Sequence, residues 1–159
     1  MSDPTPSRSA RTRSDQELLS GVALTAFKLN GQLLDVAEAL ARPVGLTAAW
    51  WQVLGAVMPA PLPVAGIARE MGITRQSVQR IADLLVDKGL AVYADNPAHR
   101  RAKLVRITEA GEAAVHQINP AHKEMARRLV DAIGPERLDE ILTAMQHLSD
   151  SLTTLNPSS

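Results

Sequence analysis

Apolar residues recur at helical spacing along most of the chain. Between residues 15 and 41, six aliphatic side chains are spaced by three, four or seven positions, which predicts a long helix with one apolar stripe. Pro43 is expected to end this helix. Thr47 is well suited to cap a second helix, which extends to about Met58. The first third of the chain is therefore predicted to be helical.

The next two predicted helices form a close pair. Within residues 64–90, one short amphipathic helix ends at Gly72 and a second extends to about Lys88. Ala68, Gly72 and Val78 have the spacing of a helix-turn-helix, which needs a small residue where the helices cross and a glycine with positive φ in the turn. We expect Val78 to pack with four apolar side chains, Ile67, Ile73, Ile81 and Leu85.

The pattern then changes to short β-prone runs. Residues 91–107 contain two such runs around a polar, charged turn, which predicts a β-hairpin. Thr108 is expected to cap a further helix of about 25 residues, kinked at Pro120. Gly134 and Pro135 separate that helix from the last one.

The last helix has a regular apolar seam. Its apolar residues are spaced alternately by three and four positions, which is typical of a coiled coil. We expect the seam to pack against residues 15–41 of the same chain or of a partner chain. The predicted dimer interface comprises Leu18, Val22, Leu138, Ile141, Met145, Leu148, Leu152 and Leu155.

Composition narrows the classes of protein. Hydrophobic residues make up 45% and charged residues 21% of the 159 positions, which excludes wholesale disorder, and 3% aromatics favour an aliphatic, helical core. Cysteine is absent, so disulfides and Cys-ligated zinc are excluded. Residues 1–14 lack the apolar region of a signal peptide and are expected to form a disordered tail. Prolines interrupt the uncharged stretch at residues 43–68, so no membrane span is expected and the protein is predicted to be cytoplasmic.

Positive charge is concentrated in one part of this neutral chain. Residues 74–106 contain seven basic and three acidic residues, a surplus of four. Arginine and glutamine side chains read guanine and adenine edges, and an arginine at a hairpin tip enters a narrow minor groove. A hairpin after a helix-turn-helix is a winged helix, and the local charge suits DNA. The predicted DNA-binding residues are Thr74, Arg75, Gln76, Ser77, Gln79, Arg80, Arg100, Arg101 and Lys103.

Three segments between residues 46 and 111 indicate a family: LTAAWWQVL, IAREMGITRQSVQRIADLLVDKGL and DNPAHRRAKLVRITEAG. Together they resemble the MarR family of bacterial winged-helix transcription regulators. The resemblance implies a mainly α fold in which residues 46–108 form a winged helix-turn-helix with a small β-hairpin wing. Residues 15–45 and 109–155 would then form a helical dimerisation domain. It also implies that Arg101 is the minor-groove residue of the wing and that Arg75, Gln76, Gln79 and Arg80 lie on the recognition helix.

The resemblance further implies a mode of action. Members of this family often bind palindromic operators as homodimers and leave DNA when a small, frequently aromatic ligand binds. A repressor of this kind is therefore expected, with double-stranded DNA, a second copy of the chain and a small-molecule effector as partners. Phe27, Trp50, Trp51 and His116 are the candidate pocket residues, with plain packing as the alternative for each.

Two positions depart from the family pattern. His99 stands where the family usually has an acidic residue that pairs with a wing arginine. A basic residue is usual near Tyr93 or Ala94, and none is present there. These departures predict a wing that is held more loosely or by other contacts.

Other classes of function have weaker support in the sequence. The four histidines lack metal-ligand spacing, and no cofactor motif or catalytic set is present, so neither a metal nor an enzyme is expected. A winged helix that acts mainly through protein–protein contacts remains the alternative. Neutralising Arg75, Arg80, Arg100 and Arg101 would separate the two, because loss of DNA binding with the protein partner retained would favour the regulator.

Overall fold

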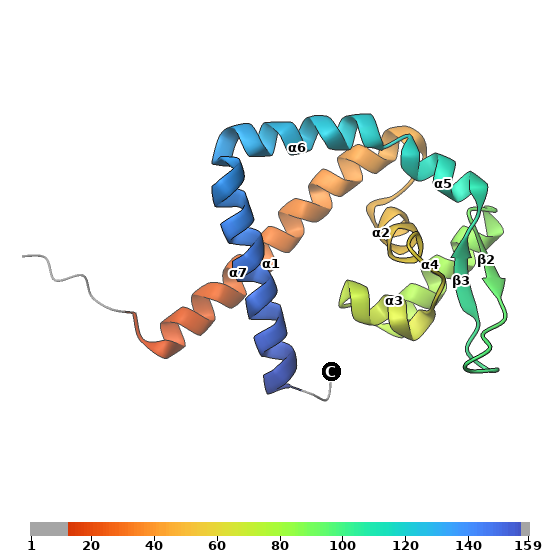
Figure 1. Cartoon of the computed structure of the whole chain (residues 1–159), viewed down its shortest axis with the longest axis horizontal. Helices are drawn as coiled ribbons and strands as arrows, with labels where there is room; N and C mark the ends of the chain where they lie inside the picture. Colours follow the sequence, from red (N-terminus) through yellow and green to blue (C-terminus); the bar gives the residue numbers. More distant parts are fainter. Residues whose placement is uncertain (1–12, 157–159) are drawn as a thin grey trace, which may run out of the picture.

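The computed structural model describes residues 13–156. Within this range a small sheet lies at one edge of a mainly helical molecule (Figure 1). The elements are α1 (Asp15–Ala41), the 3₁₀ helix η1 (Arg42–Val44), α2 (Ala48–Val57), β1 (Leu62–Pro63), α3 (Val64–Met71), α4 (Arg75–Asp87), β2 (Ala91–Ala94), β3 (Leu104–Ile107), α5 (Glu109–His116), α6 (Asn119–Ile133) and α7 (Pro135–Leu155).

Helix α1 has the predicted bounds, and local contacts explain both of its ends. Ser14 and Glu17 form a capping box, in which the Ser14 N–H donates to the Glu17 carboxylate at 2.8 Å and the Glu17 N–H donates to Ser14 Oγ at 3.3 Å. Pro43 interrupts the helix, and Gly45 turns the chain with φ 79°. Most of the predicted tail, residues 1–12, lies outside the described residues.

Helices α3 and α4 form the predicted helix-turn-helix. Gly72 adopts a left-handed conformation (φ 64°) between them, and Ala68 and Val78 are buried at the contact. Thr74 caps α4 by accepting a hydrogen bond from the Ser77 N–H at 3.1 Å. The prediction for Ile73 was wrong, because this residue lies in the turn and its side chain is 39% exposed rather than packed around Val78.

The wing is a three-stranded antiparallel sheet in the order β1-β3-β2. The predicted hairpin is confirmed, with Ala91 opposite Ile107. Strand β1 was not predicted, because the proline-rich run before α3 indicated only a turn. Its Leu62 pairs with Val105, and Pro63 is tolerated because β1 lies at the edge of the sheet.

The helix after the wing differs from the prediction. Thr108 caps it as expected, and its hydroxyl donates to the Gly89 carbonyl at 2.7 Å. Instead of one kinked helix, the chain forms two helices separated by Gln117 and the buried Ile118. Pro120 lies in the first turn of α6. An N–H in the first turn has no acceptor within the helix, so a proline there loses no hydrogen bond. Pro120 therefore begins a helix rather than kinking one.

The core lies between α2, the helix-turn-helix and the sheet. Val53, Leu54 and Val57 of α2 pack against apolar side chains of α3, α4 and β3. The N-terminus of α2 is joined to α1, because the Ala48 N–H donates to the Glu38 carboxylate at 2.7 Å. Figure 1 shows the result: the winged helix lies at one end, and α6 extends away from it to α7, which crosses α1.

Gly111 provides a test of this packing. A Cβ at this position would lie 2.2 Å from the carbonyl oxygen of Leu90, which is backbone and cannot move aside easily. We expect Gly111→Ala to destabilise the fold by about 1–3 kcal/mol, which lowers Tm by roughly 3–10 °C. Gly55→Ala is the control, because a Cβ there meets nothing within 4 Å and alanine favours a helix. Equal thermal melts for the two variants would contradict the packing around Gly111.

Candidate nucleic-acid interface

Helix α4 presents one polar face to solvent. Val78, Ala82 and Leu85 are buried on its inner side. Four of the predicted DNA-binding residues, Arg75, Gln76, Gln79 and Arg80, are exposed. Thr74 and Ser77 lie at the N-terminus of the helix, where the Thr74 hydroxyl donates to Ser77 Oγ at 2.9 Å. The N-terminus of such a helix also favours an anion such as a phosphate.

The tip of the wing is held mainly by its own turns. The Ala98 N–H donates to Asn96 Oδ1 at 3.0 Å, and the Ala102 N–H donates to the His99 carbonyl at 3.1 Å. Lys103 forms an ion pair with Asp95 at 3.3 Å, but both side chains are exposed, so this pair adds little stability. The contacts described at the tip are thus mostly hydrogen bonds between residues close in sequence. The remaining predicted wing residues, Arg100 and Arg101, are exposed.

Tyr93 joins the wing to α4. Gln79 Nε2 donates to the Tyr93 hydroxyl at 2.8 Å and to Asp83 Oδ1 at 3.0 Å, and the Tyr93 hydroxyl donates to the same Asp83 oxygen. Burial, followed by the hydrogen bond and charge of Asp83, raises the pKa of Tyr93 to about 12. The hydroxyl therefore keeps its proton throughout the physiological pH range.

A hollow of about 370 Å³ lies between the wing and the helices. It brings together Gln79, Arg101 and Lys103, three of the predicted DNA-binding residues, and Tyr93 also lines it. Its other lining residues come from the start of α3 and from the wing: Pro63, Val64, Ala65 and Ala102. The wing, α4 and the start of α3 therefore line a common hollow.

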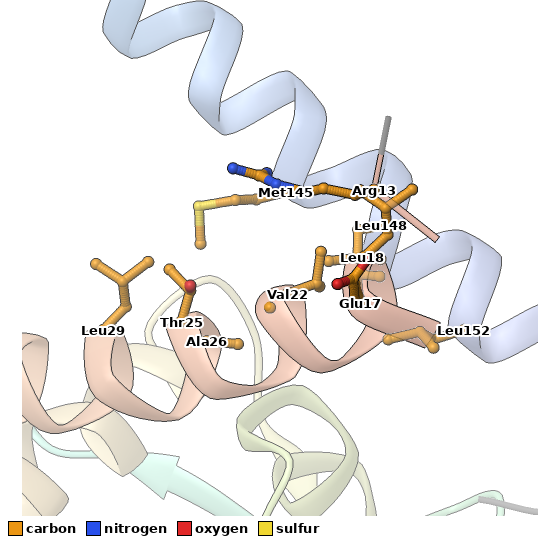
Figure 2. Close-up of a pocket in the computed structure, with 12 residues that line it drawn as sticks. Arg13, Glu17, Leu18, Val22, Thr25, Ala26, Leu29, Met145, Leu148 and Leu152 are labelled. Atoms are coloured by element: carbon orange, nitrogen blue, oxygen red, sulfur yellow. The ribbon is translucent and has the colours of Figure 1, made fainter. Parts of the chain in front are cut away.

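A second surface, on α1 and α7, is apolar. A hollow of about 630 Å³ separates the two helices, and Leu18 and Val22 of α1 face Met145, Leu148 and Leu152 of α7 across it (Figure 2). Large apolar side chains on both helices are exposed, up to 81% for Leu155. Two of the predicted interface residues, Leu138 and Ile141, line a separate hollow with Leu142 nearer the start of α7. An exposed apolar surface of this kind marks an interaction site.

The four candidate effector residues are dispersed. Phe27 is 74% exposed on α1, and His116 is exposed at the end of α5. Trp50 and Trp51 are half-buried against the core. The rings of Trp51 and His122 form a T-shaped pair with centroids 5.7 Å apart, a contact that the sequence did not reveal. Neither of the apolar hollows along α7 is lined by any of the four.

Two general features follow from the described residues. None of the helices in residues 13–156 is long and apolar enough to cross a membrane. In the same range, no three histidine or acidic side chains are grouped as metal ligands would be.

Comparison with known proteins identifies the family. The model of the MarR family matches residues 44–102. Two uncharacterized proteins, from Mycobacterium tuberculosis and Mycobacterium bovis, are each 36% identical over 131 residues, which cover 82% of this chain and 92% of the relative. The chain belongs to the MarR family.

Solved structures agree with this MarR family assignment at the level of the fold. A mutant MarR from E. coli complexed with operator DNA superimposes with a TM-score of 0.72 at 17% identity, covering 86% of this chain and 99% of that one. CouR from Rhodococcus jostii, bound to p-coumaroyl-CoA, gives a TM-score of 0.66 at 22% identity, covering 91% and 98%. The winged helix of this MarR family protein is thus confirmed.

The sequence did not identify two residues of the site in this MarR family protein. Asp83 is one of the three acidic residues counted in residues 74–106, and the sequence indicates no role for it. Tyr93 stands out there only as a position where the family usually has a basic residue nearby. The available signal was the spacing of Gln79 and Asp83 by four positions, which lets helical side chains meet. Nothing in the sequence indicated that β2 would bring Tyr93 against both.

The ionisation of Tyr93 can be measured directly, because it is the only tyrosine in the chain. We expect ultraviolet absorbance at pH 11 to show the wild-type hydroxyl still largely protonated, as a pKa of about 12 requires. Asp83→Asn should lower this pKa toward 10, although burial of the ring retains part of the shift. Circular dichroism at the same pH confirms that both proteins remain folded. An identical titration of the two proteins would show that Asp83 does not contact the hydroxyl.

Proposed function

We propose that this MarR family protein is a sequence-specific DNA-binding transcription regulator. The observation that supports this best is the exposed row of Arg75, Gln76, Gln79 and Arg80 on α4, beside a wing with Arg100 and Arg101 at its tip. Arginine and glutamine recognise base edges, and a basic wing suits the backbone and the minor groove. Residues 46–108 would form the DNA-binding domain.

The acting form would be a homodimer. Residues 15–45 and 109–155 would form its interface, because α1 and α7 expose long apolar faces that one chain leaves uncovered. Two-fold symmetry would place two recognition helices on successive turns of one face of the duplex, roughly 34–36 Å apart, so the operator would be palindromic.

Regulation would consist of repression relieved by a small molecule. CouR, with the same fold, is bound to p-coumaroyl-CoA in its solved structure, which supports a ligand of aromatic character. A ligand seated between the helical domain and the winged helix would change the spacing of the two recognition helices and release DNA. Of the four candidate contacts, Trp50 and Trp51 lie on α2, a helix of residues 46–108 that packs against α1.

Fluorescence anisotropy tests the proposal. The purified protein is titrated onto duplex DNA from its own upstream region and onto a scrambled duplex, across a series of salt concentrations. We expect tight binding to the specific duplex with a log–log salt slope of roughly −5 to −9, as about 6–10 phosphate contacts require. If the protein binds the specific and the scrambled duplex equally weakly, the next experiment is a genome-wide pull-down of bound DNA. Recovery of no enriched sequence would contradict the proposal and favour a winged helix that contacts proteins.

A further inference from the structure

One residue of the proposed recognition surface has its orientation set by the protein. Gln79 belongs to the exposed row on α4, yet its amide is bonded within the chain before any DNA is present. Its Nε2 donates to Asp83 Oδ1 at 3.0 Å and to the Tyr93 hydroxyl at 2.8 Å. Asp83 lies one turn along the same helix, and Tyr93 is on the neighbouring strand β2. The three side chains therefore join the helix to the wing.

The chemistry of these partners decides which end of the amide faces them. An ionised carboxylate only accepts hydrogen bonds, so Asp83 repels the Gln79 oxygen and attracts its nitrogen. The Tyr93 hydroxyl donates its one hydrogen to Asp83 and has only a lone pair left for Gln79. Because the raised pKa of Tyr93 keeps that hydrogen in place at neutral pH, both neighbours require the nitrogen. Gln79 Oε1 is thereby turned away from the cluster, and no donor within residues 13–156 contacts it.

The direction of the oxygen has a consequence for DNA. We propose that Asp83 and Tyr93 are positioning residues that hold the Gln79 amide with its oxygen toward the major groove, where it selects adenine or cytosine over guanine or thymine. This inference rests on the proposed function, with α4 as the recognition helix.

The base edges account for the selection. Adenine N6 and cytosine N4 each offer an amino hydrogen in the major groove, whereas guanine O6 and thymine O4 are acceptors that repel another acceptor. A free glutamine can rotate its amide and present either end. An amide held by Asp83 and Tyr93 cannot do so without placing its oxygen against a carboxylate.

Selection from a pool of random duplexes, followed by sequencing, tests the proposal. The proteins compared are wild type, Gln79→Ala, Asp83→Asn and Tyr93→Phe. Asparagine at position 83 keeps the shape of aspartate but can also donate, so it no longer dictates the orientation of Gln79. Asp87→Asn is the matched control, because it removes the same charge one turn further along α4. Removing a carboxylate also removes its repulsion of the DNA phosphates, which raises affinity for every sequence alike. That uniform gain would appear in both Asp83→Asn and Asp87→Asn.

We expect one position in each half-site where wild type prefers adenine or cytosine by about 3- to 10-fold, the range for one neutral hydrogen bond. The preference should disappear in Gln79→Ala, fall toward 1 in Asp83→Asn, be intermediate in Tyr93→Phe and persist in Asp87→Asn. Asp83 and Tyr93 engage both amide hydrogens of Gln79, so none is left for adenine N7. A Gln79-dependent preference for adenine alone would indicate the bidentate contact of a released amide and would contradict the proposal.

Other results would overturn the inference, and they distinguish it from the proposed function. A wild-type protein that selects a motif whose preferences all survive in Asp83→Asn contradicts the positioning role while leaving DNA recognition intact. A Gln79-dependent preference for guanine or thymine contradicts the orientation of the amide. A wild-type protein that enriches no sequence contradicts the proposed function and this inference together.

Discussion

Replacing Leu148 and Leu152 with aspartate is expected to convert the protein from a dimer to a monomer. Both side chains lie on α7 and face Leu18 and Val22 of α1 across the apolar hollow in Figure 2. In the proposed dimer, the partner's helices would fill this space. The double variant would place two carboxylates per chain in that interface, and an unpaired buried charge costs several kcal/mol. We expect dimer dissociation at micromolar concentration in analytical ultracentrifugation.

The same variant should lose most of its affinity for the operator. A dimer binds its second half-site as an intramolecular step, and such linkage adds about 10²- to 10⁴-fold to affinity. We therefore expect binding to the specific duplex to weaken by at least about 100-fold, while weak non-specific binding remains.

A control on the same helix distinguishes disruption of the dimer interface from a general effect of two added negative charges. Gln146→Asp with Thr153→Asp adds the same two carboxylates to α7, at exposed positions that do not line either apolar hollow. This variant should stay dimeric and keep its operator affinity within a few-fold. A Leu148→Asp, Leu152→Asp protein that remains dimeric would show that the seam is not the interface.

Periodicity alone predicted most of the fold, because long helices bury one stripe and the spacing of apolar residues reveals it. The bounds of α1 and the cap at Thr74 follow from local chemistry that the sequence displays. The failures have different causes. Strand β1 forms because β3 offers an edge to Leu62, a contact with no local signature. Before α6 the chain breaks at the buried Ile118, and Pro120 in the first turn of α6 is a local signal that fits a helix start as well as a kink.

The candidate site also has one feature that the sequence predicts and one that depends on tertiary structure. The exposed row from Arg75 to Arg80 could be predicted, since the buried positions of one helix define its opposite face. The orientation of Gln79 could not, because it depends on Tyr93 from a strand that the hairpin folds against α4. The sequence therefore predicts which side chains reach solvent, and the tertiary structure sets which of their atoms are available to DNA.

Neutralising the four arginines of the recognition surface should abolish specific DNA binding. Arg75 and Arg80 lie on the exposed face of α4, and Arg100 and Arg101 lie at the wing tip. A good arginine contact with a base is worth about 1–3 kcal/mol, and each lost phosphate contact reduces the salt slope by about 1. For the fourfold alanine variant, we expect affinity for the specific duplex to fall by at least about 1,000-fold and the salt slope to flatten.

The result is informative because these side chains make no hydrogen bond or ion pair among those found in residues 13–156. Their removal should leave the fold, the thermal melt and the dimer unchanged, since surface substitutions usually alter stability by less than about 0.5 kcal/mol each. Arg137→Ala is the control for charge, because it removes an exposed arginine of α7, remote in the fold from the wing, that pairs only with Glu140. If the fourfold variant still bound its operator, recognition would have to lie outside α4 and the wing. If wild type and variant bound a protein partner equally well and neither bound DNA, the winged helix would be a protein-binding module.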